Sequence, residues 1–176
     1  NRSWVAERTH AVEHKVRREQ CHPVIKQIID QADQFNAVDV MQDEYQRAEW
    51  ARHINLQLEN YDALMVPTAP TIYRIADVEA DPIQKNSHMG AYTNFVNFAD
   101  LSALALPNVI RDDGLPSGIT LIADAWMDQA LAHFGQQWQA TSGLNLATSK
   151  QGYQIHKSIG SEHTVKLAVV GAHLTG

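Results

Sequence analysis

Two histidines and a glutamate near the start of the chain have the spacing of a zinc-binding motif. His10, Glu13 and His14 form the pattern His-x-x-Glu-His, which occurs in one class of zinc peptidases. On a helix, residues four apart share a face, so both histidines could bind one metal ion with the glutamate beside them as a base. The site would also need a third ligand from another part of the chain, and so short a pattern recurs by chance among nine histidines. We therefore interpret the motif as a solvated polar helix face and predict no metal.

The single cysteine, Cys21, excludes an internal disulfide and any metal site built from several cysteines. It falls between two predicted helices, and the sequence fixes no base beside it. A catalytic thiolate needs such a base or a cationic surrounding. We therefore interpret Cys21 as structural.

The composition is that of a globular domain without a nucleic-acid or membrane partner. Of the 176 residues, 44% are hydrophobic, which is enough for a core of domain size. The net charge of −6 is spread evenly and argues against nucleic acid. No apolar run reaches the roughly 18 residues of a membrane span. The sequence after Asn1 does not contain a basic segment followed by an apolar one, so we expect no signal peptide. The cytoplasm is therefore the expected location.

Three helices are predicted before the first strand. The first covers residues 4–19, and Pro23 suits the first turn of the second, where its missing N–H has no consequence. Asn36 or Asp39 can cap the third helix. The apolar spacing of three and four predicts the buried positions of the three helices, which are Trp4, Val5, Val12 and Val16, then Ile25, Ile28, Ile29, Ala32 and Phe35, then Met41, Tyr45, Ala48, Ala51, Ile54, Leu58 and Tyr61.

The stretch from Tyr61 to Ala123 is expected to organise the fold. It begins with a short buried strand from Ala63 to Val66, which Pro67 ends, and continues through a proline-rich loop into a helix centred on YTNFVNF. Two apolar strands joined by an Asp-Asp-Gly turn follow. A last helix then starts at Asp124 or Asp128, and its predicted buried side consists of Trp126, Ala130, Leu131, Phe134 and Trp138.

The end of the chain has a different composition. From Thr141 to His163 the periodicity collapses into small and polar residues that are typical of a linker. Val165 to Val170 then indicates a new strand. We therefore predict three segments: a folded part at 1–141, a linker at 142–163, and at 164–176 the first strand of a truncated second domain.

Several blocks of sequence resemble the amidase-signature family, and within it the allophanate hydrolases. The blocks span nearly the whole chain and read WVAER at 4–8, VPTAPT at 66–71, NSHMGAYTNFVN at 86–97, GLPSGITLIA at 114–123 and LAVVGAHLTG at 167–176. The YTNFVN block and the tail are the most specific to allophanate hydrolases. Two positions depart from the family pattern. His88 stands where the pattern has arginine, and Pro107 is followed by Asn108-Val109 where the pattern has Ala-Gly.

The resemblance implies an α/β amidase-signature fold, a mixed sheet covered by helices, of which this chain would be the C-terminal portion. In this family a lysine and a relay serine activate a nucleophilic serine in a glycine-rich loop. No two serines of this chain are neighbours, and neither Ser117 nor Ser161, the nearest matches, has a suitable base beside it in sequence. We therefore assign no catalytic residue here, expect the chain alone to be inactive, and expect the missing N-terminal half of the amidase domain as its partner.

The resemblance also implies a substrate-binding role for Arg8. In allophanate hydrolases the arginine of the WVAER motif is understood to hold the carboxylate of allophanate, which is urea-1-carboxylate. A guanidinium suits a planar anion because it can donate two parallel hydrogen bonds. The alternative is a solvated helical arginine paired with a nearby glutamate.

A polar cluster in the YTNFVN block supplies the other candidates, and its members are Tyr92, Thr93, Asn94 and Asn97. Buried polar groups need partners, so these side chains either fasten neighbouring loops or face the substrate. Tyr92 and Asn94 lie nearest the start of the predicted helix. We therefore take these two as the further substrate-binding candidates.

The implied parent activity is hydrolysis of allophanate to ammonia and carbon dioxide through a serine acyl-enzyme, without a metal or an organic cofactor. Two alternatives stay open. One is a non-catalytic remnant or interaction domain with the amidase fold, and the other is an amidase that acts on a different small amide. Without the rest of its sheet the chain should expose apolar edges, so a homo-oligomer could form.

Overall fold

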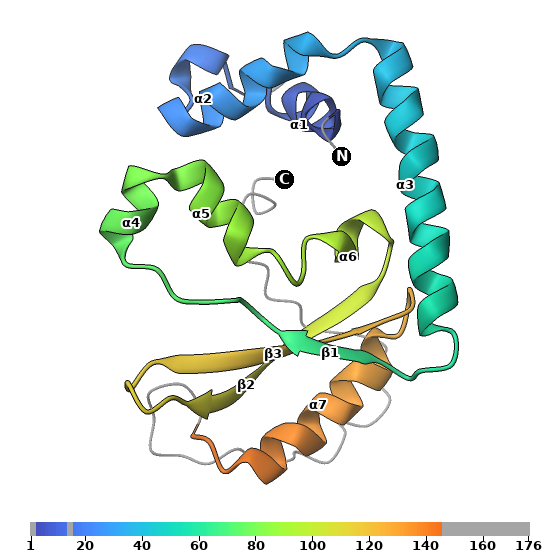
Figure 1. Ribbon diagram of the computed structural model, residues 1–176, viewed down its shortest axis with the longest axis vertical. Coiled ribbons are helices and arrows are strands. Elements are labelled where there is room, and N and C mark those ends of the chain that lie inside the picture. Colours follow the sequence, from blue (N-terminus) through green and yellow to red (C-terminus); the bar gives the residue numbers. More distant parts are fainter. Residues whose placement is uncertain (1–2, 14–15, 146–176) are drawn as a thin grey trace, which may run out of the picture.

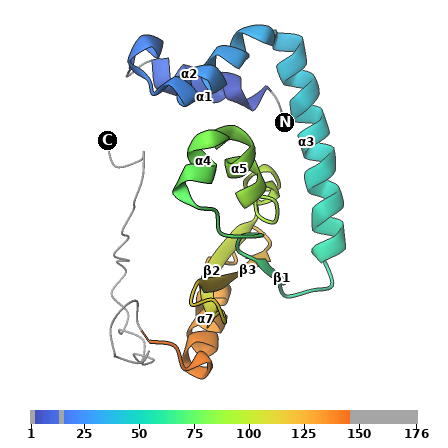
Figure 2. The ribbon, with the colours of Figure 1, turned by 60° about the vertical axis from the view of Figure 1, so that its left-hand side comes forward.

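The computed structural model describes residues 3–13 and 16–145. In chain order the elements are α1 (Trp4–Glu13), α2 (Pro23–Ile29), α3 (Ala37–Leu58), β1 (Leu64–Pro67), α4 (Ile75–Ala80), α5 (Pro82–Met89), α6 (Phe95–Phe98), β2 (Ser102–Ile110), β3 (Pro116–Ala123) and α7 (Asp128–Ser142), with short 3-10 helices at Arg18–Gln20 and Asp30–Gln34. The sheet lies between α7 on one side and α4 to α6 on the other. The long helix α3 runs along the side of the molecule and leads from α1 and α2 to the sheet (Figures 1 and 2). The expected α/β fold is confirmed.

The described strands form an antiparallel sheet in the order β1-β3-β2. The consecutive strands β2 and β3 make the predicted hairpin around the Asp-Asp-Gly turn. Within the turn, the Gly114 N–H donates to the Arg111 carbonyl over 2.9 Å. In the middle of the sheet, Ile122 of β3 stands between Leu64 of β1 and Ala103 of β2. The β2–β3 hairpin therefore pairs strands that are adjacent in sequence, whereas β1 pairs with a strand that lies far from it in sequence.

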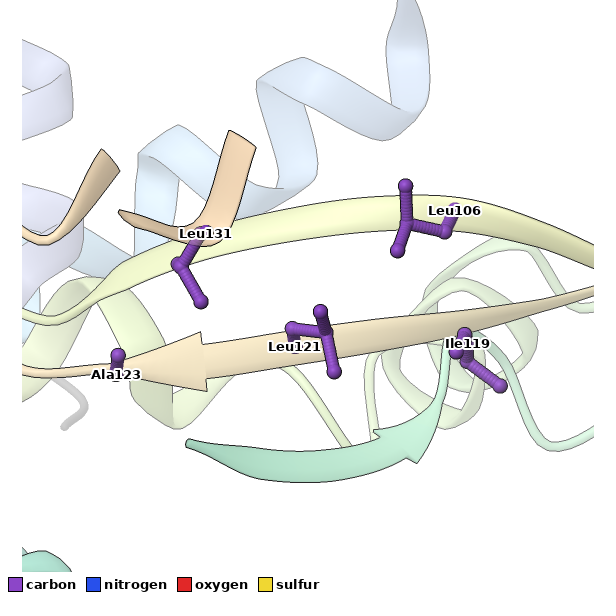
Figure 3. Close-up of a cluster of buried hydrophobic side chains, with 5 residues drawn as sticks. All are labelled: Leu106, Ile119, Leu121, Ala123 and Leu131. Atoms are coloured by element: carbon purple, nitrogen blue, oxygen red, sulfur yellow. The ribbon is translucent and has the colours of Figure 1, made fainter. Parts of the chain in front are cut away.

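The hydrophobic core lies between the hairpin and α7. Because side chains alternate along a strand, one face carries the cluster drawn in Figure 3, which consists of Leu106, Ile119, Leu121, Ala123 and, from α7, Leu131. Gly135 lets α7 come close to β2, since a Cβ at this position would lie only 2.6 Å from Leu104 Cδ2. The opposite face of β3 is buried as well, with Ile122 at 0% exposure. There the Thr120 and Thr68 hydroxyl oxygens lie 3.0 Å apart in a hydrogen bond.

The predicted cap of α3 is confirmed, but its predicted burial is wrong. The Asn36 side chain accepts hydrogen bonds from the Val38 and Asp39 N–H groups, and the Asp39 carboxylate accepts one from the Asn36 N–H. No residue of α3 is buried, and Tyr45 is 71% exposed. The apolar stripe exists in the sequence, but along most of its length no layer of the described chain covers it.

Other elements also differ from the sequence predictions. The helix expected at 4–19 is shorter in the structure. Helix α1 covers Trp4–Glu13, and a separate 3-10 helix follows at Arg18–Gln20. Strand β1 is exposed rather than buried because it forms the edge of the sheet. The helix expected around YTNFVNF is the single turn α6, preceded by turns at 90–94.

Helices α2 and α7 begin where the sequence allows, at Pro23 and at Asp128. Their buried sides are only partly as predicted. Ile29 and Ala32 are buried, whereas Ile25 is exposed. In the last helix Leu131 is buried and Trp138 half-buried, but Ala130, Phe134 and Trp126 are exposed, Trp126 to 92%. Trp126 precedes α7 with a φ of 69°, so it has no place on a helix face. Residues 146–176, which include most of the predicted linker and the whole predicted last strand, lie outside the described residues.

Candidate functional site

A polar cavity of about 390 Å³ lies between α1 and α6. Its lining combines one cation, two carboxamides, one hydroxyl and two aromatic rings, and consists of Trp4, Arg8, Thr93, Asn94, Val96, Asn97, Phe98 and Ala103. Two of the three predicted substrate-binding residues, Arg8 and Asn94, therefore meet here although α1 and α6 are far apart in sequence. The third, Tyr92, is not part of the lining and is 41% exposed.

Among the residues that the structure describes, Arg8 is the only charged one that lines this cavity. Its side chain is exposed, and within the described part of the chain no hydrogen bond or ion pair engages its guanidinium. All of its donors are therefore available. A permanent cation in a concave site that no acidic residue lines favours a small anion. The alternative is a helical arginine paired with a glutamate, but among the described residues no glutamate pairs with Arg8.

The position of α1 beside the cavity is set by Trp4. Its indole Nε1–H donates to Glu44 Oε1 over 2.7 Å, which ties α1 to α3. Its ring lies 4.7 Å from that of Phe98, centroid to centroid, at an interplanar angle of 58°. An aromatic pair at this distance and tilt is favourable beyond the area that it buries. Trp4 therefore fixes both the wall of the cavity and the helix that carries Arg8.

Arg47 of α3 also contacts both Glu44 and the α6 side of the cavity. Its Nε donates to Glu44 Oε2 over 3.0 Å, and its Nη1 donates to the Phe98 carbonyl over 3.0 Å. Its guanidinium carbon also lies 5.8 Å from the centre of the Trp4 ring. Together, the hydrogen bond from Trp4 and that from Arg47 hold the pKa of Glu44 below its ordinary value. The ionised form of the carboxylate is therefore favoured, and Arg47 lies beside it as its counter-charge.

The α6 side of the cavity is shaped by a tight run of turns. The Asn94 N–H donates to the Gly90 carbonyl over 2.8 Å, and the Val96 N–H donates to the Thr93 carbonyl over 3.1 Å. The Asn94 side chain folds back over the same turn, where its Nδ2 donates to the Ser87 carbonyl over 3.4 Å. A Cβ at position 90 would lie 2.1 Å from Asn94 Oδ1, so any residue larger than glycine would displace the Asn94 side chain from this turn.

Sequence reasoning missed the residues that hold the site together. Glu44 and Arg47 are three residues apart on a predicted helix, which is a spacing for an ion pair, and this was the only available signal. Nothing in the sequence connected them with Trp4 or with Phe98. Thr93 and Asn97 belong to the polar cluster of the sequence but are not among the predicted substrate-binding residues, and both line the cavity.

The His-x-x-Glu-His motif lies largely outside the described residues, so its prediction stays untested. His14 lies outside the described residues, as does the side chain of Glu13, and no three described His, Cys, Asp or Glu residues are grouped as metal ligands. The thiol of Cys21 contacts the Arg17 carbonyl at 3.8 Å. None of the described helices is both long enough and apolar enough to cross a membrane.

A larger cavity of about 570 Å³ lies between the end of α3, β1 and α6, and its lining is mostly apolar. It includes Ile54, Leu58, Leu64, Met65 and Phe95. His53, Gln57 and Tyr61 also line it, but no described Lys, Arg, Asp or Glu does, so it offers mainly contact area and no permanent charge that could bind an anion. The smaller cavity with Arg8 is therefore the better candidate for chemistry, although the apolar one is larger.

Comparisons with known proteins agree with this picture. The Amidase family model matches residues 5–132. Urea amidolyase of Saccharomyces cerevisiae is 37% identical over 190 aligned residues, which cover 99% of this chain and 10% of that protein. A solved Kluyveromyces lactis allophanate hydrolase has a TM-score of 0.73 at 37% identity, covering 80% of this chain and 24% of that one. The solved K. lactis urea amidolyase has a TM-score of 0.78 at 33% identity, covering 90% and 10%.

The matched urea amidolyases are far longer proteins, and this chain spans about 10% of their length. The resemblance that the sequence blocks indicated is confirmed, and so is the fold that it implied. The family model covers well over half of the chain, from the second residue of α1 into α7. The chain therefore belongs to the amidase family.

Proposed function

We propose that this chain forms the substrate-binding part of the amidase domain of an enzyme that hydrolyses allophanate to ammonia and carbon dioxide, and that the amidase domain releases ammonia through a serine acyl-enzyme. The observation that carries the proposal is Arg8, a cation without an ion-pair partner in the described chain, in a cavity that no acidic residue lines. The similar proteins of known name include urea amidolyases and an allophanate hydrolase, which supports allophanate among small amides.

The chemistry of the cavity fits the two ends of this substrate. The carboxylate of allophanate can accept two parallel hydrogen bonds from Arg8, and such charge-assisted bonds contribute about 1.5–3 kcal/mol each. The uncharged carboxamides of Asn94 and Asn97 suit the ureido part, which both donates and accepts hydrogen bonds. Trp4 and Phe98 form apolar walls for a flat molecule. Tyr92 stays a candidate that could contact the substrate only from outside this lining.

In this proposal the chain binds the substrate but does not supply the nucleophile that attacks it. We assign the lysine, the relay serine and the nucleophilic serine to the N-terminal half of the amidase domain, because no pair of serines in this sequence has the required arrangement. The expected result is that the chain alone releases no ammonia from allophanate. Release above that of a mock preparation would contradict this assignment.

The test of Arg8 uses a chimera in which this chain replaces the matching segment of the K. lactis allophanate hydrolase. We expect Arg8→Met to raise the KM for allophanate about 10²- to 10⁴-fold, since two charge-assisted hydrogen bonds of about 1.5–3 kcal/mol each are lost. Arg8→Lys keeps the charge without the planar pair of donors and should lie between. Arg52→Met removes an exposed arginine of α3 outside the cavity, and it should change nothing.

Biuret, which has a carboxamide in place of the carboxylate of allophanate, separates the proposal from a general amidase. If Arg8 binds the carboxylate, the rate of biuret hydrolysis by the chimera should be the same with and without Arg8→Met. An unchanged KM for allophanate, or an equal loss on both substrates, would show that Arg8 does not recognise the carboxylate.

A further inference from the structure

We propose that Asn97 recognises the carbamoyl end, –CO–NH2, of the substrate whose carboxylate Arg8 binds. This inference rests on the proposed function, because it concerns the same cavity. It assigns the two polar ends of one small molecule to two residues on different helices.

The two asparagines of the cavity are in different bonding states. Asn94 is occupied within its own turn, where it donates to the Ser87 carbonyl and packs on Gly90 so closely that no Cβ would fit. Asn97 also lines the cavity, and its side chain makes no hydrogen bond to any described residue. Asn94 therefore has one of its donors engaged within its own turn. Asn97 is the carboxamide whose donors and acceptor remain available to a ligand.

The backbone around Asn97 is held in place on the inner side. Val96 and Ala99 are buried to 7% and 2% exposure, and the Ala99 N–H donates to the Phe95 carbonyl over 2.9 Å. Asn97 itself is exposed at the cavity. Because the backbone of this turn is already fixed, only the Asn97 side chain must become ordered when a ligand binds, which lowers the entropic cost of recognition.

Arg8 faces the same cavity from α1, and the distance between the two helices is set by the contact of Trp4 with Phe98, the residue next to Asn97. A carboxamide can accept from the –NH2 of a carbamoyl group and donate to its carbonyl at once. It carries no charge that would compete for Arg8. The cavity therefore distinguishes its two ends, with a cation for the carboxylate and a neutral amide for the carbamoyl group.

Two probes isolate this contact, namely malonamate and acetoacetate, used as competitive inhibitors of allophanate hydrolysis by the chimera described above. They share a carboxylate and a carbonyl and differ in –NH2 against –CH3. Asn97→Ala removes the bond to the shared carbonyl from both probes and the bond from –NH2 from malonamate alone, so we expect it to raise the inhibition constant of malonamate about 3- to 10-fold more than that of acetoacetate. Asn97→Gln should restore part of the difference.

Controls separate this inference from the proposed function. Arg8→Met should weaken both probes, and Asn55→Ala, which removes an exposed amide of α3, should weaken neither. If Arg8→Met weakens both but Asn97→Ala weakens both equally or neither, Asn97 has no part in carbamoyl recognition and the inference is overturned. If Arg8→Met affects neither probe, the proposed function itself fails. Retained inhibition by acetoacetate shows that each Asn97 variant is folded.

Discussion

Replacing Gly135 by alanine tests whether the contact between α7 and the hairpin is as close as the structure shows. In an exposed helix this substitution would stabilise the protein, because alanine is better than glycine in a helix interior by about 1 kcal/mol. Here the new Cβ would lie 2.6 Å from Leu104 Cδ2 and 3.0 Å from Leu106 Cδ2. Both distances are well below van der Waals contact, so the two leucines or the helix must move.

The expected magnitude follows from these two opposing effects. Forcing one extra carbon into a packed core costs about 1–3 kcal/mol. Leu106 is 5% exposed and belongs to the core cluster, so it has little space to yield. Subtracting the propensity gain of about 1 kcal/mol leaves a net loss of about 1 kcal/mol. We therefore expect Gly135→Ala to lower the free energy of unfolding, against the intrinsic preference of the helix.

Urea unfolding followed by circular dichroism measures this loss. The neighbouring residue Gln136 is exposed on the same helix, so the difference between Gln136→Gly and Gln136→Ala gives the propensity effect without the contact. The reasoning is refuted if Gly135→Ala stabilises the chain by as much as alanine exceeds glycine at position 136. In that case α7 would not lie as close to β2 as described.

Two further predictions concern α3. The pKa of Glu44 is lowered from 4.5 by the hydrogen bonds from Trp4 and Arg47, so its ionised form stabilises the fold above that pH and the contribution disappears as the pH falls through the lowered folded value. The difference in unfolding free energy between the native chain and Glu44→Gln should therefore be largest near neutral pH and shrink on acidification, and growth of the difference in acid would mean that the sign is wrong. Asn36→Ala should lower the unfolding free energy by about 1 kcal/mol through loss of the helix cap. Asn36→Asp keeps an accepting oxygen and serves as its control in the same urea titration, where an equal loss would count against the cap.

The parts of the fold that depend on neighbouring residues could be predicted from the sequence. The β2–β3 hairpin follows from two apolar runs around a short polar turn, and the start of α3 follows from Asn36 and Asp39. Burial could not be predicted in the same way. An apolar stripe shows which side of α3 avoids water, but whether anything covers that side depends on other elements, and Tyr45 remains exposed. Trp126 has an apolar side chain, but its positive φ places it outside the helix.

The candidate site, too, could be predicted from the sequence only in part. Sequence blocks identified Arg8 and Asn94, and the structure places both at one cavity. Their proximity depends on the hydrogen bond from Trp4 to Glu44 and on the packing of Trp4 against Phe98. These contacts join segments that are distant in sequence, and no periodicity within one segment reveals them. For the same reason the different bonding states of Asn94 and Asn97 became visible only in three dimensions.

The strand order β1-β3-β2 means that the two halves of the sheet form at unequal entropic cost. The hairpin pairs β2 with β3 across one short turn, so little chain entropy is lost when its register forms. Strand β1 reaches its partner only across α4, α5, α6 and β2, since Leu64 pairs with Ile122. The entropy lost on closing a loop grows with its length, and pairs distant in sequence slow folding. The contacts of β1 must therefore offset the closure of a loop that contains the whole α6 side of the cavity.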